Sequence, residues 1–72
     1  MKDANELKAI GARLCAARIA SNLSLQDVGI AIKRNKGTVS KWERGINEPS
    51  AEALQQLAIL YRTDDFVKEA RA

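Results

Sequence analysis

The sequence predicts an all-α protein, a compact bundle of five helices that forms one domain over residues 1–72. Apolar residues recur at spacings of three and four along most of the chain, as they do in helices with one buried face. The only proline is Pro49, so helices elsewhere meet no obstruction. Only Trp42, Tyr61 and Phe66 are aromatic, and the core must therefore consist mostly of Leu, Ile, Val and Ala.

The first helix is expected to span about residues 5–21. Leu7, Ile10 and Leu14 recur at helical spacing and form one apolar face. Asn22 follows, and asparagine tolerates the left-handed conformation in which many helices end. The first helix should therefore end just before Asn22.

The second helix is expected to be short and to run from Ser24 to about Lys33. Ser24 is a good N-cap, and Asp27, three residues later, completes an acidic variant of the capping box. Leu25, Val28 and Ile32 share one face of this helix. These signals predict roughly two turns.

The third helix is expected to begin at Asn35, a good cap, and to end at Gly45. At about 100° per residue, Thr38, Val39 and Trp42 lie on one side of the helix. The Trp is therefore expected to face the core, at a different side from the basic residues. The opposite side carries Lys36, Gly37, Ser40, Lys41 and Arg44.

A fourth and a fifth helix complete the expected bundle. Ser50, directly after Pro49, starts the fourth helix, which ends at Arg62. Thr63 or Asp64 is expected to cap a short fifth helix. This last helix would carry the apolar residues Phe66, Val67 and Ala70.

The composition argues against most catalytic and membrane functions. The chain has no histidine and one cysteine, which removes His-based catalysis, Cys/His zinc sites and an internal disulfide. We expect no enzyme activity, no metal and no cofactor, and the role of Cys15 stays open. No apolar segment is long enough to span a bilayer or to act as a signal peptide. The protein is expected to act in the cytoplasm of a bacterial or phage-infected cell.

Positive charge is concentrated in the middle of the sequence. The net charge is +3, and residues 25–47 hold five basic and two acidic residues, whereas residues 48–72 hold three basic and five acidic ones. Such a cluster is either a solvated face or a local patch that binds anions. Two short helices joined by a tight turn, the second basic on its outer side, form a helix-turn-helix unit over about residues 24–45. A helix of this kind fits the major groove of double-stranded DNA.

Several segments resemble one known family. They are IGARL (10–14), LSLQDVGIAI (23–32), TVSKWERG (38–45) and PSAEALQQLA (49–58). With them the chain resembles the lambda-repressor-like (Xre-type) helix-turn-helix proteins over about residues 7–67. The resemblance implies sequence-specific binding of double-stranded DNA by a transcriptional regulator, most simply a phage-type repressor that binds a two-fold operator as a homodimer.

The resemblance also implies roles for individual residues. An arginine of the first helix pairs with the glutamate of WERG, here Arg18 with Glu43. The expected base contacts are Lys36, Gly37, Ser40 and Lys41. The expected phosphate contacts are Ser24, Gln26, Thr38, Arg44 and Asn47, with Lys33 and Arg34 as additions of this chain. The expected dimer patch comprises Leu60, Tyr61, Phe66 and Val67.

Several positions depart from the usual pattern of the family, among them Arg34, which stands where an apolar residue is common, and the segment 62–65. Lys33 stands where the turn usually has glycine, and a left-handed lysine would cost about 1–2 kcal/mol. Gly29 stands where the second helix usually has alanine, which permits a close helix contact at a cost of about 1 kcal/mol in helix propensity. Leu25 replaces a glutamine that commonly touches phosphate or braces the recognition helix.

An alternative function from another class is a protein-interaction adaptor or an antitoxin that reuses the same fold. The outward bases Lys36, Lys41 and Arg44 favour DNA over this alternative. The expected partners are thus double-stranded DNA and a second copy of the chain, without a membrane or a small-molecule substrate.

Overall fold

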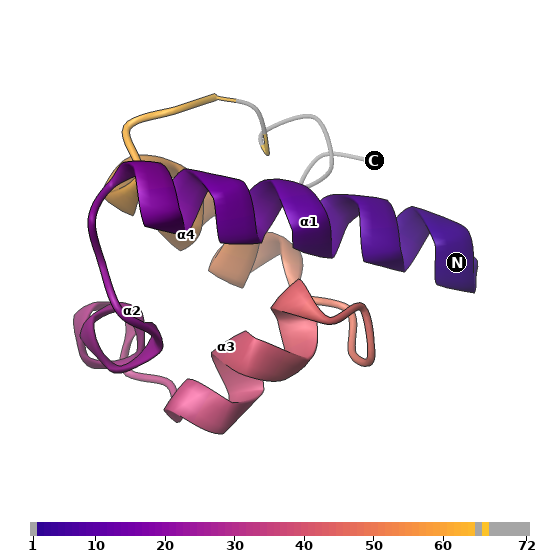
Figure 1. Cartoon of the computed structure of the whole chain (residues 1–72), viewed down its shortest axis with the longest axis horizontal. Helices are drawn as coiled ribbons and strands as arrows, with labels where there is room; N and C mark the ends of the chain where they lie inside the picture. Colours follow the sequence, from indigo (N-terminus) through magenta and orange to yellow (C-terminus); the bar gives the residue numbers. More distant parts are fainter. Residues whose placement is uncertain (1, 65, 67–72) are drawn as a thin grey trace.

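The computed structural model describes residues 2–64 and residue 66. Over these residues the chain forms four helices, α1 (Ala4–Ala20), α2 (Leu25–Ile32), α3 (Lys36–Glu43) and α4 (Ala51–Leu60), and no strand. In Figure 1, α2 and α3 lie on one side of the long helix α1, and the segment after α4 passes along the other side. The all-α prediction is confirmed. None of the described helices has the length and apolar character needed to cross a bilayer.

Local capping fixes where each helix begins. The side chain of Asp3 accepts a hydrogen bond from the Glu6 amide at 2.8 Å and starts α1. Asn35 accepts from the Gly37 amide at 2.7 Å and starts α3. Ser50 Oγ accepts from the amide of Ala53 at 3.1 Å and starts α4. Each cap satisfies an amide that has no acceptor inside its own helix.

A capping box starts α2, as the sequence predicts. Ser24 Oγ accepts from the Asp27 amide at 3.0 Å, and the Asp27 carboxylate accepts from the Ser24 amide at 2.9 Å. The hydrogen bonds from Ser24 lower the pKa of the Asp27 carboxyl, because they favour its charged form. The beginning of α2 is therefore held by two reciprocal contacts.

One apolar core joins the four helices. Its largest fully buried side chains are Phe66, Leu14, Leu57, Val28 and Val39, which come from every helix and from the segment after α4. Trp42 of α3 is 6% exposed and belongs to the same core. Burial of apolar surface on this scale is the main force that holds a small helical domain together.

The expected fifth helix is absent from the described residues, so the five-helix prediction is wrong. Arg62 has a left-handed φ of 54°, which breaks the helical path directly after α4. The Thr63 amide then donates to the carbonyl of Ala58 at 2.9 Å, a contact that closes the end of a helix. Thr63 and Asp64 are not helical, and Val67 and Ala70 of the expected helix lie outside the described residues.

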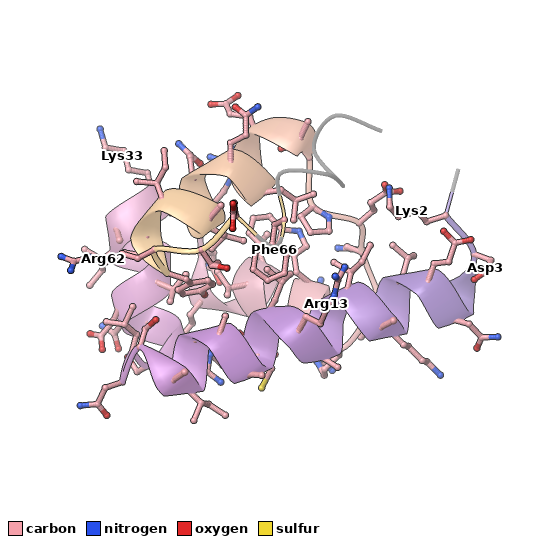
Figure 2. The ribbon with its side chains drawn as sticks, turned by 90° about the horizontal axis from the view of Figure 1, so that it is seen from above. Lys2, Asp3, Arg13, Lys33, Arg62 and Phe66 are labelled. Atoms are coloured by element: carbon pink, nitrogen blue, oxygen red, sulfur yellow. The ribbon has the colours of Figure 1, made fainter. Side chains whose placement is uncertain are left out.

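Phe66 explains why the sequence pattern after α4 was misleading. Its side chain is completely buried. Figure 2 shows Phe66 between α1 and α4, where the Arg13 guanidinium of α1 lies 5.8 Å from the centre of its ring. A cation at this distance from an aromatic ring is attracted to its face. The apolar character of this position therefore belongs to a residue that closes the core between α1 and α4.

Candidate nucleic-acid interface

The turn between α2 and α3 has the left-handed geometry that usually calls for glycine. Lys33 adopts φ 59° and ψ 48° and caps α2. The Arg34 amide then donates to the carbonyl of Gly29 at 2.8 Å. The turn thus keeps its shape, and the lysine adopts a conformation that costs an L-residue about 1–2 kcal/mol.

Gly29 allows the chain to fold back closely after this turn. A Cβ at Gly29 would lie 2.5 Å from the carbonyl oxygen of Arg34 and 3.3 Å from the amide nitrogen of Lys36. The close approach that the sequence suggested for Gly29 is therefore made to the backbone of the turn. It sets the distance between α2 and the first residue of α3.

The two sides of α3 have different environments. Val39 and Trp42 are buried, whereas Lys36 and Lys41 are exposed. The other predicted base contacts, Gly37 and Ser40, are half-buried. The helix thus uses one side for the core and presents two lysines and a hydroxyl group on the other.

A groove of about 470 Å³ lies between the first turn of α2 and the outer side of α3. Three of the four predicted base contacts line it. A second depression, of about 320 Å³, lies along the turn and includes Lys33, Arg34 and Lys36. The lining residues of the first groove are Ser24, Leu25, Gln26, Lys36, Gly37 and Ser40.

Most of the predicted phosphate contacts are exposed, and four of them line one of these two depressions. The exception is Thr38, which is half-buried in the first turn of α3. The amides of Leu25 and Gln26, in the first turn of α2, have no acceptor within the helix and are suited to an external oxygen. The exposed members of the set are Ser24, Gln26, Lys33, Arg34, Arg44 and Asn47.

Arg18 and Glu43 form the contact that ties α3 to α1. Arg18 Nε donates to Glu43 Oε2 at 2.8 Å, and Nη2 donates to Oε1 at 3.2 Å. The hydrogen bond to Glu43 raises the pKa of Arg18. The same guanidinium reaches the Leu23 carbonyl at 2.8 Å and Cys15 Sγ at 3.8 Å. One side chain thus joins α1, the start of α2 and the end of α3.

Two glycine contacts that position α3 were not predicted. A Cβ at Gly11 would overlap the carbonyl oxygens of Trp42 and Glu43, so α1 and the end of α3 meet backbone to backbone. Gly45, with φ 73°, lies against the backbone of Lys8 in the same way. A glycine inside a helical pattern was the signal available in the sequence for the first of these contacts.

The residues of the expected dimer patch lie in different environments. Tyr61 and Phe66 are buried in the core of the same chain, at 8% and 0% exposure, and Leu60 is half-buried. Val67 lies outside the described residues. Leu60 lines a groove of about 260 Å³ between α2 and α4, together with Ala31, Ile32, Gln56 and Ile59.

The described part of the chain contains no group of three or more His, Cys, Asp or Glu residues that could hold a metal ion. A family model described as a helix-turn-helix domain matches residues 9–70. Searches of curated proteins and of solved structures returned no significant match.

Proposed function

Because the chain belongs to the helix-turn-helix domain family, we propose that it binds double-stranded DNA with α3 in the major groove. The observation that carries this proposal is the division of α3 into two sides. Val39 and Trp42 hold the helix in the core, and Lys36 and Lys41 remain exposed on the other side. Lysines placed in this way suit the acceptor atoms O6 and N7 of guanine.

The surrounding exposed residues suit the sugar-phosphate backbone. Lys33, Arg34 and Arg44 provide charge for phosphate oxygens, and the first turn of α2 provides amides. Phosphate contacts of this kind fix the register of a protein on DNA, while base contacts select the sequence. The proposed base contacts are Lys36, Gly37, Ser40 and Lys41, and the proposed phosphate contacts are Ser24, Gln26, Lys33, Arg34, Thr38, Arg44 and Asn47.

At the finer level we propose a transcriptional repressor of the lambda-repressor-like (Xre) type that binds its operator as a homodimer. The Arg18–Glu43 pair and the left-handed turn at Lys33 support this assignment. Two copies would place their α3 helices in major grooves about one helical turn, roughly 34 Å, apart.

The groove between α2 and α4 is the surface that we propose for the contact between the two copies. Ile59 is 78% exposed beside it, and Leu60 is half-buried in its wall. Gln56 Oε1 is buried there and has no hydrogen-bond partner within the described residues.

Selection from random duplex DNA tests the proposed function. Affinity for duplex DNA should fall steeply with salt, and the selected sites should converge on one motif with two-fold symmetry. A selected motif without two-fold symmetry would be consistent with DNA binding but would exclude binding as a symmetric dimer. Failure to bind any duplex at low salt would reject DNA binding and favour a protein-interaction adaptor or antitoxin.

A further inference from the structure

We propose that the groove between the first turns of α2 and α3 receives the C5-methyl group of a pyrimidine, a readout that rests on the proposed binding of duplex DNA. Leu25 contributes the only apolar side chain among the six residues that line this groove. It is half-buried and packs against the core, so its position is fixed while part of its surface stays accessible. The groove therefore has an apolar wall in the middle of a polar surface.

Gly37 leaves room beside this wall. A Cβ at Gly37 would have one neighbour within 4 Å, Asn35 Oδ1 at 3.0 Å. The space next to the Gly37 backbone is thus open on the side away from its own helix. Leu25 and Gly37 together form a notch, which we call the methyl notch, with an apolar wall and no side chain on its floor.

The major groove offers one apolar group that such a notch could contact. Thymine carries a C5-methyl group there, whereas the other bases present hydrogen-bond donors and acceptors. A cytosine methylated at C5 presents the same group. Lys36 lies at the edge of the methyl notch and could donate to a purine on a neighbouring base pair, so the two contacts would read adjacent positions.

A phosphate oxygen suits the methyl notch less well. It would place a charged oxygen against Leu25 and strip it of water, which is costly.

Replacement of single thymines by deoxyuridine tests the proposal, because it removes the methyl group and leaves base pairing unchanged. The site selected from random duplex DNA is synthesised with one replacement at a time, and the affinity is measured by fluorescence anisotropy at constant salt. One thymine in each half-site should show an affinity loss of about four-fold, the value expected for one buried methyl group.

Two variants assign the effect to the methyl notch. Gly37→Ala places a methyl group on its floor, and Leu25→Gln replaces its apolar wall. In both variants the penalty for uracil should disappear at that thymine. Gly37→Ala keeps the result interpretable if Leu25→Gln folds poorly, since alanine is the better helix former. Ile19→Gln is the matched control, because Ile19 is 63% exposed on α1 and should leave the four-fold penalty unchanged.

The outcomes separate the proposal from the function on which it rests. Absence of duplex binding by the wild type overturns the DNA-binding function itself. If the protein binds DNA, but its affinity changes neither when uracil replaces thymine nor when each cytosine is methylated at C5, the role of the methyl notch is rejected and DNA binding stands. A gain on cytosine methylation without a uracil penalty assigns the notch to 5-methylcytosine, and a uracil penalty assigns it to thymine. A uracil penalty that persists in both variants places the methyl contact elsewhere and overturns the assignment.

Discussion

Arg18 and Glu43 meet in a two-pronged ion pair that joins α1 to the last turn of α3, with only 15% and 8% of their side chains exposed. The Arg18 guanidinium is thereby shared between the carboxylate, the Leu23 carbonyl and the Cys15 thiol. The orientation of α3 therefore depends on a contact whose two ends are 25 residues apart in the sequence.

Glu43→Gln should lower the free energy of unfolding by about 3–5 kcal/mol, because it leaves the Arg18 charge half-buried without a counter-ion. Urea unfolding of the single variants and of the double variant Arg18→Met/Glu43→Gln measures the coupling. Lys2 and Glu48 provide the matched control, since their pair at 3.4 Å is more exposed and its loss should cost less than about 1 kcal/mol. Absence of coupling between Arg18 and Glu43 would reject the role given to this pair.

Phe66→Ala should destabilise the fold by about 3–5 kcal/mol, because it empties a fully buried position in the core. Phe66→Leu keeps most of the apolar volume and should cost less than half as much. Thermal unfolding of both variants measures which of them is destabilised more. Equal and small effects would mean that the segment after α4 does not close the core.

Gly29→Ala should destabilise the protein more than Gly37→Ala does. Alanine is the better helix former at both positions by about 1 kcal/mol. At Gly29 the new Cβ would meet the Arg34 carbonyl at 2.5 Å, so the turn must shift and the protein should be destabilised. At Gly37 the new Cβ would meet a side-chain atom, Asn35 Oδ1 at 3.0 Å, which can move by a few tenths of an ångström, so Gly37→Ala should destabilise the protein less than Gly29→Ala. Denaturant midpoints of the two variants measured side by side decide this; a stabilised Gly29→Ala would contradict the close contact at the turn.

Lys41→Ala and Arg44→Ala should separate base contacts from phosphate contacts. Loss of the proposed base contact of Lys41 should reduce discrimination between the selected site and random duplex DNA by about 1–3 kcal/mol. Loss of the proposed phosphate contact of Arg44 should weaken binding to both duplexes and lower the salt slope by about 0.9. Salt titrations on the two duplexes measure both quantities, and an unchanged sequence preference in Lys41→Ala would remove Lys41 from the base contacts.

Tyr61 should make the protein sensitive to alkaline pH. Burial raises the pKa of its phenol from 10.0 to about 12, and the nearby Glu43 carboxylate adds to the increase. Because the folded-state pKa lies above the unfolded one, the contribution to stability is complete below pH 10 and is lost as the pH rises through 12. Wild type should thus lose roughly 2–3 kcal/mol relative to Tyr61→Phe across this interval. An equal loss of stability in wild type and Tyr61→Phe would show that ionisation of the phenol does not cause the loss.

The starts of α2, α3 and α4 could be predicted from the sequence because local residues set them. Ser24, Asn35 and Ser50 cap the helices that they were expected to cap. Helical phase also placed Val39 and Trp42 in the core and Lys36 and Lys41 on the surface. Each of these features depends on side chains within a turn or two of one another.

The features that the sequence did not predict depend on contacts between distant segments. Phe66 fits the apolar spacing of a helix, but the left-handed Arg62 and the space between α1 and α4 decide its actual role. The contact of Gly11 with the carbonyls of Trp42 and Glu43 likewise exists only once α1 and α3 cross. Neither the crossing of α1 and α3 nor the burial of Phe66 between α1 and α4 produces a periodic pattern in the sequence.

The inward residues of α3 stabilise the fold, whereas its outward residues contribute little to stability. Val39 and Trp42 bury the helix, and Glu43 anchors its end through Arg18, while Lys36 and Lys41 are exposed to solvent. Exposed substitutions away from special backbone positions rarely change stability by more than about 0.5 kcal/mol. The DNA preference that we propose for this surface can therefore change, in evolution or in the laboratory, almost independently of whether the chain folds.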